Sequence, residues 1–305
     1  MGIFSIILTI IGLAVFEAVS SLDNAIINAQ VLTTMSARAR KWFLSYGLLI
    51  SVFIVRGLLP LVIVWVANPS LGPVGALTAT FSADPQVQRS IEASSPLLLI
   101  GGGMFLLFLF FHWLFLEPKH FGLRGEQFIQ SQGIWFYSIV STLLTGLVWL
   151  SLRVHPLMAL GAVAGATIFF IVHGFEENAE KAEKGLMQGN ITSDLSKLFY
   201  LEIIDATFSV DGVLGAFAFT LAVPLILLGN GIGALIVRSV TVRSVTVIKQ
   251  YKYLKNGAMY SIFFLGCVMV LDSFGVRVPQ WVSPIMTISI IGYFFLKSKK
   301  TVNVV

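Results

Sequence analysis

The stretch IFSIILTIIGLAVFEAVSSLDNAIINAQV (residues 3–31) is apolar for most of its length, yet it contains two acidic residues, Glu17 and Asp23. About 20 apolar residues in a helix are enough to cross the hydrocarbon core of a bilayer. A carboxylate at the bilayer centre costs about 2.5–3.5 kcal/mol unless it is paired, protonated or hydrated. Residues 3–31 therefore predict a membrane-spanning helix whose acidic residues are retained for function.

The rest of the chain has the same apolar character. Of its 305 residues 56% are hydrophobic and 11% are charged, and the mean hydropathy is +0.88. A soluble domain has about 45–50% apolar and roughly 25% charged residues. The composition predicts an all-α, polytopic membrane protein, a single membrane domain over residues 1–305 in contact with the lipid bilayer. We expect about nine transmembrane helices, at residues 3–31, 42–67, 96–116, 134–152, 156–172, 198–220, 223–240, 258–271 and 281–296.

The basic residues between the predicted spans set the orientation, because Lys and Arg are retained on the cytoplasmic side. One set of alternate loops holds only Arg89, Arg153 and Arg277. The other set and the C-terminal end hold all remaining basic residues except Arg56 and Arg238, which fall inside predicted spans. We expect a protein of the plasma (inner) membrane with its N-terminus outside and its C-terminus cytoplasmic. The net charge of +5 follows from these loops, and no module for nucleic acid is present.

The acidic motif of the first span recurs later in the chain. Residues 17–24 (EAVSSLDN) align with residues 205–212 (DATFSVDG), and the downstream IVR of residues 54–56 matches residues 236–238, each nine residues past a glycine, Gly47 or Gly229. Five spans separate the copies, so we expect them to run in opposite directions, as in secondary transporters with a substrate site at the repeat interface. The expected divisions are pseudo-repeat 1 at about residues 1–116, linker spans at 117–197 with a polar cytoplasmic loop at 173–197, pseudo-repeat 2 at about 198–275, and a final span at 281–296.

The two copies supply hard oxygen donors. A divalent cation compensates several buried carboxylates at once, and carboxylate, amide and hydroxyl oxygens suit manganese, calcium or magnesium. A metal cage built on cysteine is excluded, since Cys267 is the sole cysteine. Protons are the alternative to a metal ion at these carboxylates, because buried carboxylates also act as proton relays. The candidate donors are Glu17, Asp23, Asn24, Asp205 and Asp211, with Ser21, Ser209, Glu202, Arg56 and Arg238 as accessory residues.

The spacing within each motif conflicts with a straight helix. Ser21, Asn24 and Asn28 share a helical stripe with Glu17, but Asp23 lies about 120° away around the axis. The same offset recurs in the second copy. Either the helix is interrupted near the serines, which we expect, or the two carboxylates face different partners. The competing interpretation for the aspartates is an internal ion pair with one of the two intramembrane arginines.

The largest polar segment spans residues 173–197. Acidic and basic residues four apart in it predict a short amphiphilic cytoplasmic helix, which could dock a cytoplasmic partner. The alternative is an acidic regulatory metal site that includes His173 and Glu176.

Three smaller features have structural explanations. Gly101-Gly102-Gly103 lacks the Lys-Ser/Thr ending of a phosphate loop and lies in an apolar span, so it predicts close helix packing. His112, near the end of that span, is expected at a helix interface. Glu117 and Asp272 are expected where spans reach water.

At the two motifs the sequence resembles the TerC family of integral membrane proteins, which is grouped with the LysE-like transporters. The resemblance is carried by residues 17–28 and 202–219, and residues 229–238 and 253–258 point to a subgroup known only as a domain of unknown function. It implies manganese efflux. One residue departs from the pattern, because Gly212 stands where the first copy has Asn24, so the copies cannot donate identical side chains. The implied metal ligands are Glu17, Asp23, Asn24, Asp205 and Asp211.

These observations predict a secondary transporter that exports a divalent cation, with manganese favoured and calcium or magnesium as alternatives. Protons are the candidate coupling ion, and a homo-oligomer is one candidate assembly. We expect no tightly bound cofactor and no enzymatic activity, since no hydrolase motif falls in a span. The alternative function is a non-transporting membrane scaffold of a metal or tellurite stress-response complex, with a structural ion at the carboxylates.

Overall fold

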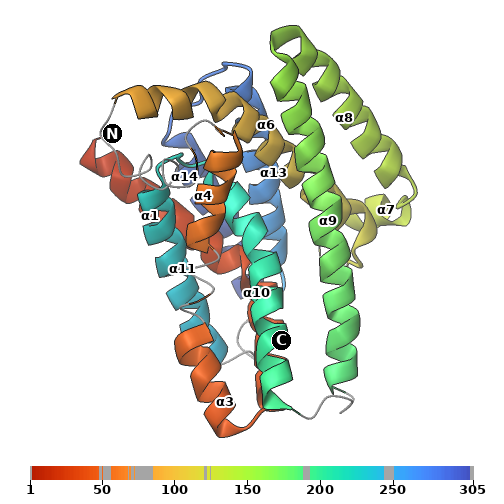
Figure 1. The fold of residues 1–305 in the computed structure, drawn as a ribbon. Coiled ribbons are helices and arrows are strands. Elements are labelled where there is room, and N and C mark those ends of the chain that lie inside the picture. The colour runs from red at the N-terminus through yellow and green to blue at the C-terminus, as the bar shows by residue number, and fades with distance from the viewer. Residues whose placement is uncertain are drawn as a thin grey trace.

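The computed structural model describes residues 2–47, 50, 56–67, 69, 72, 85–119, 122–123, 125–187, 193–243 and 251–302, and within these ranges it contains helices and no strand (Figure 1). The side chains of Asp23, Asn24, Arg56 and Arg238 lie outside the description. In chain order the helices are α1 (Ile3–Ser20), α2 (Leu22–Thr33), α3 (Ala37–Trp42), the π-helix η1 (Phe43–Gly47), α4 (Arg56–Ala67), α6 (Pro85–Leu116), α7 (Glu126–Ser131), α8 (Trp135–Val154), α9 (Pro156–Met187), α10 (Asp194–Ala216), α11 (Val223–Arg243), α13 (Leu254–Ser273) and α14 (Val282–Val302).

Five helices are long and apolar enough to cross a membrane, so the chain is a multi-pass membrane protein. They are α1, residues 94–116 of α6, α8, residues 156–178 of α9, and α13, and α11 adds a shorter apolar stretch at residues 223–237. Each of the nine predicted segments contains helix, but the count of nine spans stays a prediction. The middle of α10 is less apolar because it carries Glu202, Asp205 and Asp211.

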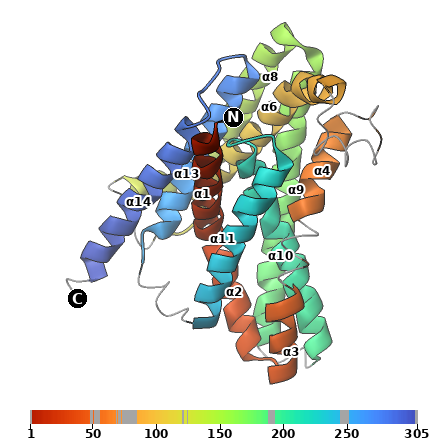
Figure 2. The ribbon, with the colours of Figure 1, turned by 90° about the vertical axis from the view of Figure 1, so that its left-hand side faces the viewer.

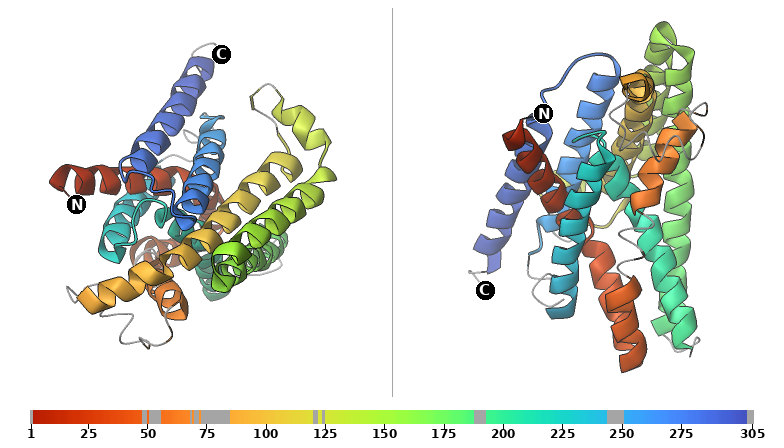
Figure 3. Two further views of the ribbon diagram at one scale, coloured as in Figure 1. Left: turned by 90° about the horizontal axis from the view of Figure 1, so that it is seen from above. Right: turned by 60° about the vertical axis from the view of Figure 1, so that its left-hand side comes forward.

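Helices α6 and α13 form the centre of the bundle. Seen from above, α6 runs between α13 and α9, while α8 covers the outer side of α9 (Figure 3). On the other side α1 packs on α11 and α14, and α2 and α3 lead from α1 to the end of the molecule where α10 begins (Figure 2). Helix α10, which holds the second acidic motif, contacts helices on both sides, α6 and α9 on one and α1 and α11 on the other.

The three consecutive glycines of α6 allow this close packing, as the sequence predicted. A Cβ atom on Gly101 would stand 3.0 Å from the carbonyl oxygen of Gly161 on α9, and one on Gly103 would stand 3.0 Å from that of Gly266 on α13. A Cβ atom on Gly165 would collide with the carbonyl oxygen of Gly101. Small residues that let helix backbones approach are typical of helix interfaces in membranes.

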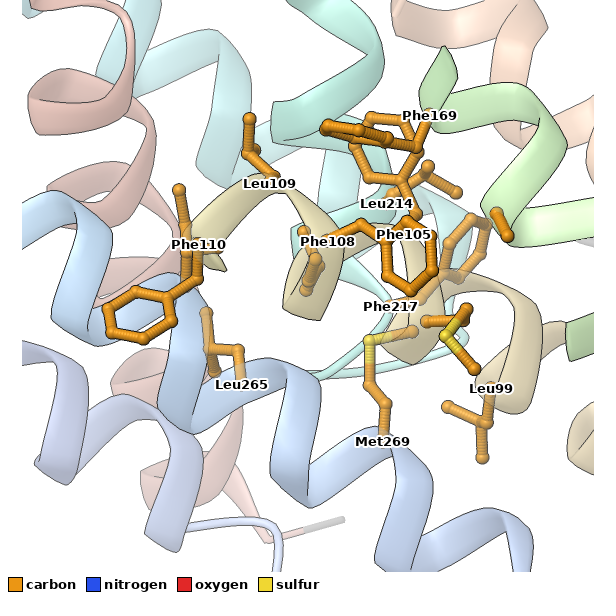
Figure 4. Packing of buried hydrophobic residues seen from close by; sticks show 14 of the residues in the cluster. Leu99, Phe105, Phe108, Leu109, Phe110, Phe169, Leu214, Phe217, Leu265 and Met269 are labelled. Carbon is orange, nitrogen blue, oxygen red and sulfur yellow. The ribbon is translucent and has the colours of Figure 1, made fainter. Parts of the chain in front are cut away.

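The main core fills the space between these helices with aromatic and aliphatic side chains (Figure 4). Phe105 and Phe108 of α6 meet Phe169 of α9 edge to face, with ring centroids 6.0 and 5.7 Å apart. A second, smaller cluster joins the helices that carry the two acidic motifs at their lower end in Figure 1, and it consists of Val31, Leu32, Met35, Ala39, Phe43 and Leu201.

The polar segment at residues 173–197 differs from the prediction. We expected a separate short helix after the fifth span, whereas α9 continues without a break from Pro156 to Met187. An uninterrupted helix keeps every backbone hydrogen bond within the segment, so the polar residues extend the span. The side chains of Glu180, Lys181 and Lys184 lie outside the described residues.

A polar network attaches the segment after α6 to α13. The carboxylate of Glu126 is 2% exposed and accepts hydrogen bonds from Asn256 Nδ2 and Tyr260 Oη, both at 2.8 Å. Nearby, Lys255 Nζ lies 2.6 Å from Glu117 Oε2. Glu117, expected at a water interface, therefore ends its helix in an ion pair that is partly exposed.

The α6–α9 contact can be tested with a matched pair of glycines on one helix. Gly165→Ala should destabilise the protein by about 1–3 kcal/mol, the usual effect of overpacking, and lower its melting temperature in detergent by several degrees. Gly174→Ala is the control, because a Cβ atom there meets nothing within 4 Å. Intrinsic fluorescence during thermal unfolding measures both, and equal melting temperatures would refute the close contact.

Candidate ion-binding site

The helix of the first motif is interrupted at one residue, Ser21, which separates α1 from α2 with φ −84° and ψ 5°. Hydrogen bonds still cross the break, since Ser21 N donates to Glu17 O at 3.1 Å and Ala25 N donates to Ser21 O at 3.0 Å. The hydroxyl of Ser21 donates to Glu17 Oε1 at 2.6 Å. The predicted interruption is confirmed here as a local change of direction, with the serine held against the carboxylate.

The second motif lies in an unbroken helix. Helix α10 runs from Asp194 to Ala216 through Asp205, Ser209 and Asp211. The hydroxyl of Ser209 donates to the backbone oxygen of Asp205, one turn earlier, so it bonds within its own helix. The interruption predicted for this copy is therefore wrong.

The two motifs contact each other inside the bundle. Glu17 is fully buried, and a Cβ atom on Gly212 of α10 would stand only 2.7 Å from its Oε2. Asn28 Nδ2 of α2 donates to Asp205 Oδ1 at 3.4 Å. Residues nearly 200 positions apart are thus placed at one site. The departure from the repeat at Gly212 has a physical reason, because any side chain there would push into the Glu17 carboxylate.

The glycines downstream of each motif leave space for side chains of the opposite copy. A Cβ atom on Gly47 of η1 would collide with Glu202 Oε1 of α10, and one on Gly229 of α11 would collide with Leu13 of α1. Gly233, one turn after Gly229, likewise stands against the Glu17 side chain. These reciprocal contacts bring α1, α10 and α11 together around the buried carboxylate.

Several buried polar atoms of α10 and α11 have no hydrogen-bond partner among the described residues. They are Asp211 Oδ1, Glu202 Oε1 and both amide atoms of Asn230. Asn230 of α11 is 1% exposed. One face of α11 meets α1, and another meets α4 where Leu227 contacts Gly57. Asn230 lies between these two faces. Such atoms are rare in folded proteins and often mark a place for water or an ion. Acidic and amide oxygens are the donors that a hard cation prefers.

Gly212, which directly follows Asp211 in α10, lies against the Glu17 carboxylate, so acidic residues of both motifs lie in one region of the bundle. Like charges repel strongly where water is scarce, so such a group is stabilised by a bound cation or a proton. The site therefore involves α1, α2 and α10, the helices that carry the two motifs.

The described side chains do not complete a metal site by themselves. Among them, no three His, Cys, Asp or Glu residues gather closely enough to hold a metal ion. Asp23 and Asn24 follow the break at Ser21 at the start of α2, but their side chains lie outside the description, as do those of Arg56 and Arg238. The full ligand set and the competing ion pairs with arginine both remain predictions.

Two buried amide residues, Asn28 and Asn230, were not among the donors that the sequence predicted. Asn28 shares the helical stripe of Glu17, which is a signal that could have identified it. Asn230 is an isolated amide in an apolar helix, and such residues in membrane spans commonly serve function or helix association.

The contact between the motifs can be tested by adding a charge. Asn28→Asp would place a second carboxylate next to Asp205, so we expect a melting temperature several degrees below that of the wild type at pH 7.5. The difference should shrink as the pH falls towards 5 and one carboxyl group binds a proton. Asn178→Asp, at an exposed position of α9, is the control. Identical behaviour of the two variants at both pH values would argue against the contact.

Comparison with known proteins gives one match. A family model described as "Protein of unknown function (DUF475)" matches residues 22–303. No curated protein and no solved structure matches the chain.

Proposed function

We propose that this chain, which belongs to the DUF475 family of unknown function, is a secondary transporter of a divalent metal cation. The observation that carries the proposal is the contact of two acidic motifs inside a bundle of apolar helices, with Glu17 fully buried against Gly212. A site at the meeting point of two such motifs is the arrangement typical of secondary transporters.

Charge balance supports a cation as the substrate. Glu17 is 0% exposed and Asp205 is 7% exposed, and Asp211 Oδ1 is buried. Buried negative charge of this density is stabilised by a divalent ion. Asp23 and Asn24 follow directly at the start of α2 and are the residues that we assign to complete the ligand set.

The break at Ser21 supports movement at the site. Discontinuous helices beside a bound ion are a recurring feature of transporters, because two helix segments can change their relative orientation. Ser21 holds Glu17 through its hydroxyl, so a change in direction between α1 and α2 would move a ligand. Glu202, whose Oε1 lies buried against Gly47, precedes Asp205 on α10. In the orientation that the basic loops predict this is the cytoplasmic side of Asp205, and we assign Glu202 the role of a gate.

Manganese is the favoured ion because the motifs resemble those of the TerC family, and export is the direction that this resemblance implies. Calcium and magnesium use the same oxygen donors. The competing function, a membrane scaffold with a structural ion, predicts tight binding without flux. Transport measurements therefore separate the two.

Removal of one carboxylate charge tests the site. In proteoliposomes that contain the full chain and a manganese-sensitive dye, Asp211→Asn and Glu17→Gln should lower manganese flux by about 10–100-fold, the range typical for loss of a residue that supports a metal site. Asp272→Asn is the control, since its Oδ1 accepts a hydrogen bond from Val278 N at 2.8 Å and an amide oxygen can replace it.

Wild-type flux in the Asp211→Asn variant would show that the site is elsewhere. Manganese binding to the wild type without any flux would favour the scaffold.

A further inference from the structure

An apolar groove opens where α1 packs between α11 and α14 (Figure 2). It has a volume of about 450 Å³. Ile236 and Phe295 in its wall are 46% and 39% exposed, so the groove is open to the surroundings of the protein. Because α1 crosses the membrane, the groove lies beside the acyl chains of the bilayer. Its other lining residues include Val15, Val19, Ile288 and Gly292.

The apolar groove continues into a smaller pocket that is basic. The two share the lining residues Val19, Leu22, Tyr251 and Leu254. The smaller pocket has a volume of about 150 Å³, and it is also lined by Lys252 and Lys255. One continuous depression therefore changes from apolar to basic along its length.

Positive charge exceeds negative charge among the described residues at the basic end. Lys252 is exposed in the turn before α13. Lys255 Nζ lies 2.6 Å from Glu117 Oε2 in a partly exposed ion pair. Lys297 of α14 adds a third ammonium group, with its Nζ 4.6 Å from the ring centroid of Tyr253. A single carboxylate thus stands near three lysines, which favours an anionic ligand.

The change from apolar to basic occurs at the level expected for the membrane surface. Tyr251 stacks on Phe295 there, with ring centroids 5.0 Å apart, and tyrosine is enriched where membrane meets water. Lys252 and Lys255 belong to a basic connection that the charge rule places on the cytoplasmic side. Basic pockets between membrane helices on that side bind the headgroups of anionic lipids.

We propose that this depression is a binding site for one anionic phospholipid of the cytoplasmic leaflet. An acyl chain lies in the groove between α1, α11 and α14, and the phosphate group lies at Lys252 and Lys255. An ammonium group has three hydrogen-bond donors, so Lys255 can hold Glu117 and a phosphate oxygen together. The site does not depend on the proposed transport.

The lipid would contact both sides of the break in the first motif. Ser20 is the last residue of α1 and Leu22 is the first of α2, and both line the basic pocket. A lipid bound there stabilises the present orientation of the two helices. A ligand that binds the folded state alone also raises the melting temperature.

Native mass spectrometry of the full chain in a neutral detergent tests the site. Phosphatidylglycerol is titrated, and phosphatidylcholine with the same acyl chains is the comparison. We expect one phosphatidylglycerol to bind at least tenfold more tightly than phosphatidylcholine, because two lysines contact its phosphate without a competing choline group. Phosphatidylglycerol should also raise the melting temperature, and phosphatidylcholine should not.

A glycine in the groove allows the acyl-chain contact to be tested. Gly292→Leu should fill the groove, because a Cβ atom at Gly292 meets nothing within 4 Å. We expect its affinity for phosphatidylglycerol to fall to that for phosphatidylcholine. Gly146→Leu on α8 is the matched control, since a Cβ atom there also meets nothing within 4 Å, and it should bind as the wild type does.

The headgroup contact has its own pair of variants. Lys252→Gln should weaken phosphatidylglycerol binding about fivefold, the effect of one lysine at a membrane surface. Lys299→Gln removes the same charge from an exposed position in the last turn of α14 and should leave the affinity unchanged. If Gly292→Leu melts below the wild type without lipid, Lys252→Gln is the decisive variant.

Four results would overturn the site. Equal affinities of the wild type for the two lipids show that no headgroup is recognised. Wild-type affinity in a folded Gly292→Leu variant shows that the lipid binds elsewhere on the surface. Displacement of the lipid by glycerol 3-phosphate shows a phosphate site that needs no acyl chain. A wild-type dimer that Gly292→Leu dissociates shows that a second copy of the chain fills the groove.

Discussion

The burial of the Glu17 carboxylate is the constraint on which the arrangement of the site depends. Gly212 of α10 leaves room for the carboxylate oxygens, and Gly233 of α11 leaves room for the aliphatic part of the same side chain. A larger residue at either position would hold one of these helices away from α1. The glycines therefore bring three helices together around a group that a bilayer strongly disfavours.

The molecule divides into a region of apolar packing and a region of polar contacts. Around α6, α9 and α13 the core consists of aromatic rings and of glycine contacts between backbones, which resist change because the side chains interlock. Around α1, α2 and α10 the contacts include a helix break at Ser21, a hydrogen bond of 3.4 Å between Asn28 and Asp205, and buried polar atoms such as Asn230. The proposed transport would use this division, with a packed frame beside a polar site.

The sequence was sufficient for the helical membrane class, because about 20 apolar residues have few alternatives to a spanning helix. The spacing of six between acidic residues also indicated the break at Ser21. The same spacing failed at Ser209, where the hydroxyl bonds to the preceding turn and the helix continues. Whether the helix is interrupted at the serine depends on which acceptor the serine hydroxyl reaches. The motif does not determine that acceptor.

Contacts between distant segments were beyond the reach of the sequence. The pairing of Asn28 with Asp205 and the contact of Glu17 with Gly212 depend on how α1, α2 and α10 pack. The continuation of α9 to Met187 was missed for a related reason. Its charged residues indicate contact with water, but they do not say whether the helix ends there.

Helix α10 shows how a site of this kind is compatible with a bilayer. Three carboxylates in its apolar part, Glu202, Asp205 and Asp211, lower its hydropathy, and it is not among the helices apolar enough to count as a span by composition. It has an unusually large set of neighbours, because α1, α2, α4, α6, α9, α11 and α13 all contact it. Those helices place protein, rather than lipid, around much of the acidic helix. The carboxylates that lower the hydropathy of α10 thus lie on a helix that other helices surround on several sides.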